Sequence, residues 1–422
     1  MNSSYILTKD VKHKGDYDVI VAGGGLAGIA AAVSATRAGK KTLLVEKTIC
    51  LGGLATIGLV NFFVPMCNGR GVQIIKGMAE EFFQLSIKYG FDTFPECWKE
   101  GTQKEDSPRY VTKFSAPIFA LALDEYVKNE GVTVLYDSIL SYAAMDKGHC
   151  EGVIVENKSG SEYYTAKMFV DATGDADLMR FAGMPTVQGE NYHTMYAYGC
   201  DTQSCQKVID TSDIAKVYKT FYGGNADLHG NGQPEDKPLW KGADAYELTD
   251  YVVENHLELL NKIKNEDKTK RDIFCLPTMP QLRTTCHLDG DATFTEDAAY
   301  KHYDDSIAAI CDFDRRDFVY EVSYKVLVKT GFDNIITAGR TASAEGFGWD
   351  LIRVIPPAII TGQAAGNACS QAIDERMPIY GISISELQKK LENQNVMIHF
   401  DDSLISDGKG EGTGEKVDVG HI

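Results

Sequence analysis

The stretch from residue 17 to residue 47, YDVIVAGGGLAGIAAAVSATRAGKKTLLVEK, constrains the fold more than any other part of the chain. An apolar run at 19–22 predicts a buried parallel strand, and a glycine-rich turn and an alanine-rich helix over 29–37 follow it. A second apolar run at 42–45 ends on Glu46. The GxGxxG spacing thus lies between a strand and a helix. In that context it indicates a dinucleotide-binding unit rather than an ordinary glycine-rich turn.

Each glycine of this turn has a separate physical role. Gly23 permits the tight turn, Gly25 lets the backbone approach a pyrophosphate, and Gly28 lets the helix and strand come close together. The helix N-terminus supplies amide donors and a positive dipole for the phosphates. Glu46, eighteen residues after Gly28, is placed to accept hydrogen bonds from ribose hydroxyls. The unit therefore predicts a site for an adenine dinucleotide.

Composition limits the class of protein. With 422 residues, 44% of them hydrophobic, the chain can bury a large core, and we expect two domains. A net charge of −18 argues against nucleic acid or an anionic membrane as partner. We see no signal-like N-terminal segment and no run apolar enough to span a bilayer. Ten cysteines without a CxxC pair predict reduced thiols and a cytoplasmic location.

The first half of the chain continues with two segments that should approach the cofactor. The glycines of CLGGLATIG at 50–58 leave few side chains in the way of a ligand. DATGD at 171–175 follows an apolar run and is the second place where backbone can meet a dinucleotide. Periodicity predicts helices over 72–89 and 115–129 and strands over 132–136, 152–156 and 168–171.

From about residue 181 to residue 331 the composition becomes polar and aromatic, which predicts an inserted substrate or cap domain. A helix is expected there over 250–265 with Thr249 as its N-cap, and MPQLR at 279–283 follows it. The chain then predicts a strand over 334–338, a loop over 344–348 and a helix over 358–373 that two prolines introduce. The last twenty or so residues lack apolar periodicity and are expected to be disordered.

Five blocks in this order resemble the FAD-dependent oxidoreductases of the FAD_oxidored type: VAGGGLAGIAAAVSATRAGKKTLLVEK, LGGLATIGLV, FVDATGDADLMRFAG, MPQLR and NIITAGRTASAEGFGWDLIRVIPPAIITGQAAGNA. The resemblance implies an α/β fold, with a Rossmann-like, glutathione-reductase-like FAD domain and an inserted mixed α+β substrate domain. The expected divisions are a lead-in at 1–16, the FAD domain at 17–182 and 332–396, the insertion at 183–331 and a flexible tail at 397–422.

The implied cofactor is non-covalent FAD, extended with its adenine at the first βαβ unit and its ring against the insertion. The start of the 358–373 helix would present positive dipole near the ring. Arg340 and Arg353 either contact FAD or form structural salt bridges. The residues implied to bind FAD are Gly23, Gly25, Leu26, Ala27, Gly28, Glu46, Lys47, Gly53, Ala55, Thr56, Ala172, Thr173, Gly174, Asp175, Gly339, Arg340, Arg353, Ile355 and Gly362.

The chain departs from some flavoprotein patterns. It carries one GxGxxG, so transient docking of NAD(P)H, an external electron carrier and the substrate itself all stay open as electron sources. Cys200 and Cys205 have a Cys-x4-Cys spacing, for which two ordinary thiols are favoured over a redox pair. A homodimer also stays open, and no metal site is expected.

The expected chemistry is hydride exchange between flavin N5 and a small polar organic substrate. Oxidation of a CH–OH or CH–NH group needs a base, and reduction of a C=C needs an acid. The catalytic candidates, in order, are Arg283, His287 and His193, with Tyr192, Asn61 and Arg70 behind them. A purely structural role is the alternative for each histidine. An electron-transfer or RNA-modifying subunit, or a flavin sensor without turnover, are the other functions left open.

Overall fold

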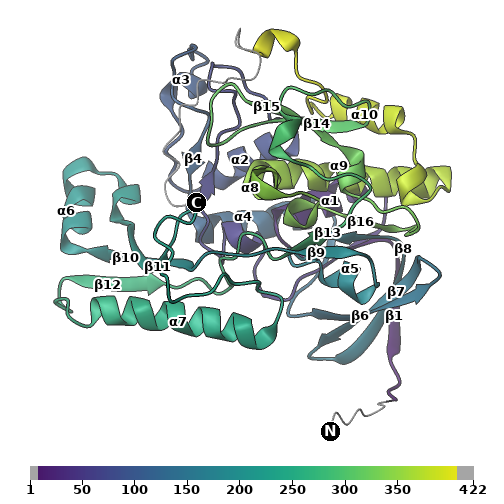
Figure 1. Ribbon diagram of the computed structural model, residues 1–422, viewed down its shortest axis with the longest axis horizontal. Coiled ribbons are helices and arrows are strands. Elements are labelled where there is room, and N and C mark those ends of the chain that lie inside the picture. Colours follow the sequence, from purple (N-terminus) through teal and green to yellow (C-terminus); the bar gives the residue numbers. More distant parts are fainter. Residues whose placement is uncertain (1–7, 406–422) are drawn as a thin grey trace.

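The computed structural model describes residues 8–405 and is a mixed α/β structure built on a seven-stranded, largely parallel sheet. The strand order is β5-β2-β1-β8-β7-β6, and β16 pairs with the second half of β8 (Figure 1). Strands β5, β2, β1, β8 and β16 are parallel, whereas β7 is antiparallel to both β8 and β6. The bounds are β1 Lys12–Ala22, β2 Thr42–Val45, β5 Thr133–Leu135, β6 Ile139–Asp146, β7 His149–Asn157, β8 Gly160–Asp171 and β16 Ile335–Thr337.

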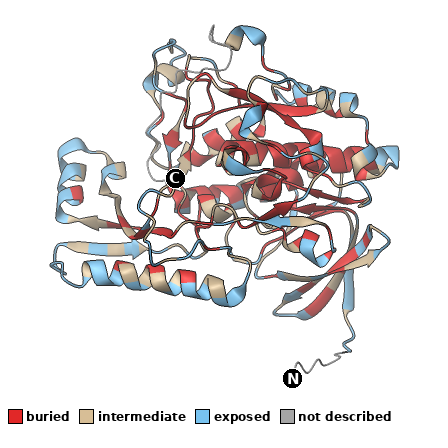
Figure 2. Ribbon diagram, viewed as in Figure 1, coloured by how far each residue is buried: buried red, intermediate tan, exposed pale blue. Residues whose placement is uncertain are grey.

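Two helices, α1 (Leu26–Arg37) and α9 (Ile355–Glu375), pack against one another and are buried along most of their length (Figure 2). Small residues make this close approach possible. A Cβ atom at Gly362 would lie 2.1 Å from the carbonyl oxygen of Ala27, and one at Gly366 would lie 2.2 Å from that of Ala31. The alanine and glycine content of both helices is therefore a packing requirement.

Further elements complete the main body around this core. The helices are α2 (Met78–Ile87), α3 (Glu96–Lys99), α4 (Ala116–Asn129), α5 (Asp177–Phe181), α8 (Gly346–Arg353) and α10 (Ile384–Asn393). The strand pairs are β3 (Phe62–Phe63) with β4 (Thr112–Lys113), β9 (Thr186–Gln188) with β13 (Cys286–Leu288), and β14 (Ser306–Cys311) with β15 (Val319–Ser323).

Residues 194–275, which we call the outer unit, form a separate three-stranded sheet. Its antiparallel order is β11 (Lys219–Asn225), β10 (Thr194–Asp201) and β12 (Arg271–Cys275), and it also contains α6 (Thr202–Thr211) and α7 (Ala245–Ile263). Figure 1 shows α7 lying along this sheet, at the lower left. A small core of Met195, Ala197, Phe221 and Leu259 joins the helix to the sheet.

Several predicted elements are confirmed, namely the strands at 19–22 and 42–45 and the helix at 115–129. Two predictions about helix starts are wrong. The 72–89 helix begins only at Met78, because Ile74 and Ile75 donate their amides to Met66 across the chain. The α7 helix begins at Ala245, because Asp244 caps the amides of Tyr246 and Glu247. Thr249 lies within the first turns of the helix.

The predicted domain limits also differ from the structure. The segment 183–331 contributes to two regions, because β14 packs against α9 and α10, and the side chains of β14 and β15 belong to the main core rather than to the outer unit. Strand β1 begins at Lys12, inside the expected lead-in, because residues 12–17 pair with β8. Of the expected tail, residues 397–400 lie along β14, and residues 406–422, like 1–7, fall outside the described residues.

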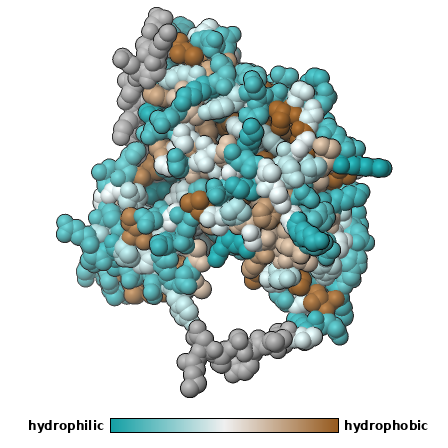
Figure 3. All heavy atoms as spheres, turned by 45° about the vertical axis from the view of Figure 1, so that its right-hand side comes forward, coloured by the Kyte–Doolittle hydropathy of each residue, from teal (hydrophilic) through white to brown (hydrophobic). Residues whose placement is uncertain are grey.

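The face of the molecule drawn in Figure 3 is mainly hydrophilic, with small separate apolar groups. This agrees with the strongly acidic composition. No helix within residues 8–405 combines the length and the apolar character that a membrane span requires.

Candidate cofactor and substrate site

A cavity lies beyond the carboxyl ends of the parallel strands, the usual ligand position in such sheets. Its walls come from segments that are far apart in the sequence: the first glycine turn, the end of β2, the 52–57 loop, the turn after β8 and the start of α9. The predicted cofactor residues that line it are Gly23, Gly25, Leu26, Ala27, Glu46, Lys47, Gly53, Ala55, Ala172, Thr173, Gly174, Gly339, Arg340, Arg353 and Ile355.

Gly25 shows that a ligand fits this cavity. Among the glycines of residues 8–405, it alone combines an ordinary negative φ, −67°, with open space around an added Cβ atom. Neither backbone strain nor packing within the protein therefore requires glycine at this position. A group occupying the cavity beside the backbone would require it, as the pyrophosphate of a dinucleotide would at the start of α1.

Glu46 lines the cavity at the end of β2 and is itself held in place by hydrogen bonds. One carboxylate oxygen, Oε2, accepts from the amide of Gly24 at 2.6 Å, and the other, Oε1, accepts from the amide and hydroxyl of Thr48, both at 2.7 Å. These bonds tie the first glycine turn to the end of β2. They orient a carboxylate on the wall where a ribose would lie.

Four predicted cofactor residues do not line the cavity and instead shape the backbone behind it. At Gly28, a Cβ atom would lie 1.9 Å from the Gly23 carbonyl oxygen, and Gly362 lies against α1. The Thr56 hydroxyl donates to the Leu51 carbonyl at 2.6 Å. Asp175 pairs with Arg340. Their role in the structure is to permit and hold the turns.

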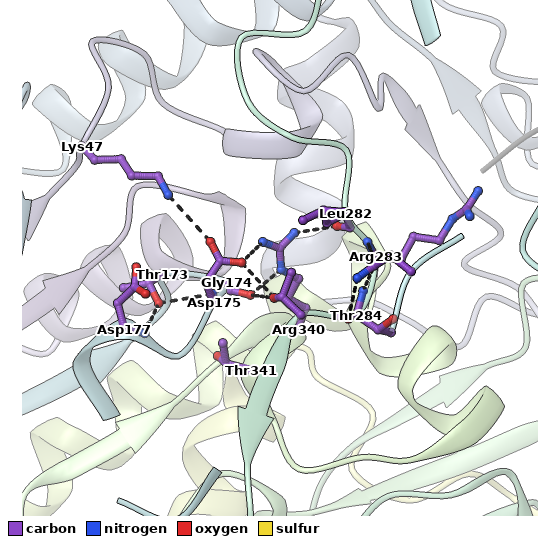
Figure 4. Close-up of polar contacts among 12 residues, drawn as sticks. Lys47, Thr173, Gly174, Asp175, Asp177, Leu282, Arg283, Thr284, Arg340 and Thr341 are labelled. Carbon is purple, nitrogen blue, oxygen red and sulfur yellow. Dashed lines mark hydrogen bonds and ion pairs between the residues drawn. The ribbon is translucent and has the colours of Figure 1, made fainter. Parts of the chain in front are cut away.

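Arg340 joins three segments of the chain (Figure 4). Its guanidinium donates to the Gly174 carbonyl, to Asp175 Oδ1 at 2.7 Å and to the Leu282 carbonyl at 2.9 Å. Burial raises the pKa of Asp175, but Arg340, Lys47 and the Thr285 hydroxyl outweigh it, so that pKa is lowered. Arg340 is therefore a structural ion-pair partner that also lines the cavity, and its contact with FAD stays a prediction.

The turn after β8 is shaped by a buried carboxylate. Asp171 accepts from the amide and hydroxyl of Thr173, at 3.0 and 2.8 Å, and from the amide of Met179 at 2.9 Å. Full burial outweighs these bonds and raises the pKa of Asp171 to about 6. The second glycine turn thus depends on an acid that titrates well above its usual range.

A second cavity lies between residues 188–192, the Arg283 segment and α8. Arg283, Tyr192, Trp349 and Asp350 are among its lining residues. Burial and the charge of nearby Arg353 lower the pKa of Arg283 to about 10. Arg353 lines the first cavity and donates to Asp350 Oδ1 at 2.7 Å, so one ion pair connects the walls of the two cavities.

The two predicted histidines lie outside both cavities. His287 Nδ1 contacts the Leu288 carbonyl at 2.6 Å, and its ring packs edge-on against Trp349. His193 is fully buried at the edge of the outer unit, with Nε2 3.1 Å from Glu258 Oε1 and Nδ1 3.3 Å from Asn255. Burial lowers the pKa of both imidazoles.

The weaker candidates Asn61 and Arg70 also lie outside both cavities. The Asn61 amide donates to the Phe114 carbonyl at 2.7 Å and accepts from the Tyr198 hydroxyl at 2.7 Å. Arg70 forms a bidentate pair with Asp317, at 2.7 and 2.9 Å. Both side chains therefore make structural contacts.

Several lining residues are not among the predicted cofactor residues. Ser138, Ile139 and Leu140 enter from the start of β6, and Met279 enters from the segment that follows the outer unit. That segment is anchored to the 50–58 loop: the Thr278 amide donates to the Ile57 carbonyl at 2.9 Å, and the Gln281 side chain donates to the Gly58 carbonyl at 2.8 Å. Only these tertiary contacts bring Met279 to the cavity.

All ten cysteines are free thiols, Cys200 and Cys205 included. Burial is the largest cause of the raised pKa of Cys200, and proximity to Cys205 adds to it. A raised thiol pKa disfavours the reactive thiolate.

The sequence model of the FAD dependent oxidoreductase family matches residues 18–276 and 275–391. A comparison with curated proteins gave no match. Among solved structures, a geranylgeranyl bacteriochlorophyll reductase-like protein from Thermoplasma acidophilum has a TM-score of 0.44 and 15% identity, covering 95% of this chain and 97% of its own. The p-nitrophenol 4-monooxygenase PnpA from Pseudomonas putida DLL-E4 has a TM-score of 0.48 and 13% identity, covering 90% and 84%. The family match spans nearly the whole chain, so the protein belongs to the FAD dependent oxidoreductase family and is an enzyme that uses FAD.

Proposed function

We propose that this enzyme transfers hydride between flavin N5 and a small polar organic substrate, at a CH–OH, CH–NH or C=C group. The observation that carries the proposal is the Arg353–Asp350 ion pair, which links the cavity that fits FAD to a second large cavity. The second cavity is the proposed substrate site. The main body would then be a glutathione-reductase-like FAD domain, with the outer unit and the Arg283 segment covering the ring.

The residues of the first cavity divide along the length of the cofactor. Gly23, Gly25 and the start of α1 would hold the pyrophosphate, and Glu46 would hold the ribose. Arg353, the last residue of α8, and Ile355, the first residue of α9, lie at the end nearest the second cavity and would hold the ring. When bound, FAD supplies the N5 position that accepts or donates hydride.

Arg283 is the proposed substrate-binding group. It is a half-buried guanidinium, and a partly desolvated charge binds a carboxylate or polarises a carbonyl more strongly than a fully exposed one. Asn191 fixes the Arg283 backbone by accepting its amide at 2.7 Å. Tyr192 lines the same cavity and carries a hydroxyl suited to proton transfer. His193 and His287 would then position these groups without touching the substrate.

The electron partner is proposed from the sequence. With a single GxGxxG in the chain, a nicotinamide nucleotide would dock transiently, or the substrate itself would reduce the flavin.

Anaerobic photoreduction followed by stopped-flow mixing with small carboxylates and carbonyl compounds tests the proposal. We expect reoxidation of the reduced flavin by at least one of these compounds, with a KM that rises at least tenfold in Arg283→Gln. Arg180→Gln, at an exposed position outside both cavities, is the matched control and should leave KM unchanged. A colourless protein that refuses FAD, or an unchanged KM in Arg283→Gln, contradicts the proposal.

A further inference from the structure

Two histidines and a glutamate from three separate segments meet at a place that neither cavity includes. Glu321 lies in β15, His302 precedes β14, and His399 belongs to the segment after α10. Their ligand atoms all lie within 4.8 Å of one another. The Nδ1 atoms of both imidazoles lie close to the same carboxylate oxygen of Glu321. The distance from Glu321 Oε1 is 2.6 Å to His302 Nδ1 and 3.0 Å to His399 Nδ1.

The carboxylate at the centre of this cluster is fixed from behind. Glu321 is completely buried, and its second oxygen, Oε2, accepts the Tyr303 amide at 2.7 Å. The first oxygen is thereby turned toward the two imidazoles. A buried carboxylate is costly unless cations or hydrogen-bond donors compensate it, so Glu321 Oε1 needs a cation or hydrogen-bond donors at this point.

The side of the His302 ring that faces away from Glu321 also has defined contacts. Its other ring nitrogen, Nε2, lies 2.9 Å from Asp402 Oδ1, and the ring stacks on Phe400 with a centroid distance of 4.4 Å. A carboxylate on the far nitrogen of a histidine is the arrangement that orients histidines ligating a metal and raises their basicity. The cluster thus has an inner set of three ligand atoms and an outer set that holds two of those ligands.

We propose that His302 Nδ1, Glu321 Oε1 and His399 Nδ1 bind a Zn²⁺ ion, with water as the fourth ligand. Zn²⁺ takes histidine nitrogen and carboxylate oxygen in tetrahedral geometry. Bonds of about 2.0–2.1 Å space neighbouring tetrahedral ligands about 3.3 Å apart. From the present 2.6 and 3.0 Å, Glu321 Oε1 has to move away from His302 Nδ1 by about 0.7 Å and from His399 Nδ1 by about 0.3 Å. Zn²⁺ binds the unprotonated Nδ1 atom of an imidazole, so metal binding competes with protons and weakens at low pH.

The position of the site indicates a structural role for the metal. The segment that carries His399 already lies along β14, where the Ala309 amide donates to the Met397 carbonyl at 2.6 Å and the Ser306 hydroxyl donates to the Ile398 carbonyl at 2.7 Å. A metal shared by His302, Glu321 and His399 would pin this segment to β15 and to the loop before β14. The competing interpretation is a metal-free set of imidazolium–carboxylate ion pairs.

The test uses the FAD-loaded enzyme, stripped with a chelator and then given Zn²⁺ alone. We expect one Zn²⁺ per chain by elemental analysis after dialysis, and a Zn²⁺-dependent rise in the thermal midpoint. His302→Ala and His399→Ala should each lower Zn²⁺ affinity at least tenfold. Asp402→Asn changes an exposed side chain, so we expect the fold to be retained. Because Asp402 contacts His302 Nε2, this variant should lower Zn²⁺ affinity about tenfold to a hundredfold.

His149→Ala, at an exposed histidine on β7 outside the cluster, is the matched control and should keep full affinity. Flavin content should be the same in all variants, so failure here is separable from failure of the proposed function. The proposed Zn²⁺ site is ruled out if the wild type retains no Zn²⁺. It is also overturned if the rise in thermal midpoint is equal in the wild type and His399→Ala, which would leave the ion-pair interpretation.

Discussion

The FAD-binding body and the outer unit are stabilised in different ways. In the body, α1 and α9 touch through backbone, with Gly362 and Gly366 against carbonyl oxygens of the facing helix. In the outer unit, α7 rests on its sheet through a core of only four buried side chains. Its outward face exposes several large apolar residues, including Leu257 at 51%.

This difference indicates how the two regions tolerate change. Close contact between backbone atoms leaves no room for an added atom. A substitution at this contact should therefore destabilise the whole body. A small core can lose local packing while the rest of the molecule stays folded. The cofactor half is therefore rigid by construction, and the outer unit is the region of lower local stability.

Gly362→Val should have the largest effect. The first added carbon would meet the Ala27 carbonyl at 2.1 Å, and overpacking against backbone cannot be relieved by a rotamer change. We expect the free energy of unfolding to fall by about 3 kcal/mol or more, measured by urea denaturation. Gly381→Ala, at an exposed glycine of ordinary φ, should change it little. Equal losses in both variants would show that the helix contact is not tight.

Leu259→Ala should have a smaller and more local effect. Removing this buried side chain of α7 leaves a cavity and should cost about 2–3 kcal/mol. Hydrogen exchange should accelerate in β10, β11 and α7 and stay slow in α1 and α9, with flavin retained. Leu257→Ala, at an exposed position of the same helix, is the control. Acceleration in α1 as well would mean that the two regions unfold together.

The two regions should respond to acid with opposite sign. The folded pKa of Asp171 is raised to about 6 by burial. Between about pH 6 and pH 4 the folded state therefore binds its proton first, and stability rises as pH falls, by on the order of 2 kcal/mol. The folded pKa of His193 is lowered by burial. Below about pH 6.5 the unfolded chain binds that proton more readily than the folded chain does. The free energy of unfolding therefore decreases as the pH is lowered.

Region-resolved hydrogen exchange across this pH range measures both responses. Asp171→Asn should flatten the pH response of the turn after β8, and His193→Gln should flatten that of the outer unit. Each variant serves as the control for the other. A loss of both responses in one variant would contradict the assignment of each group to its own region.

Gly25→Ser should have the smallest effect on the fold and a selective effect on the cofactor. Serine is a favourable N-cap, so the start of α1 is not weakened, but its side chain enters the space that the open cavity leaves at this position. We expect FAD affinity to fall at least tenfold, about 1.4 kcal/mol, measured by flavin fluorescence titration. Gly15→Ala, where an added Cβ meets only the Tyr17 ring, is the control. Unchanged affinity would contradict the placement of the pyrophosphate.

The cofactor half could be predicted from local sequence because its requirements are local. A turn at Gly23 with φ of +103° and a carboxylate at the end of the next strand each leave a mark at a fixed spacing. The same reasoning does not reach the surroundings of a side chain. His287 and His193 have the residue type of a proton carrier, but the fold buries them against Trp349 and Glu258. Residue type alone does not determine burial.

By itself, then, the sequence determined the dinucleotide turn, the order of the strands and helices around it and the membership in an FAD-dependent family, since neighbouring residues encode backbone geometry. Only the tertiary structure decided that Arg353 and Asp350 link two cavities, that Met279 reaches the first of them, and that His302, Glu321 and His399 meet. These are contacts between segments far apart in the chain. They depend on how helices and strands pack, which no local spacing records.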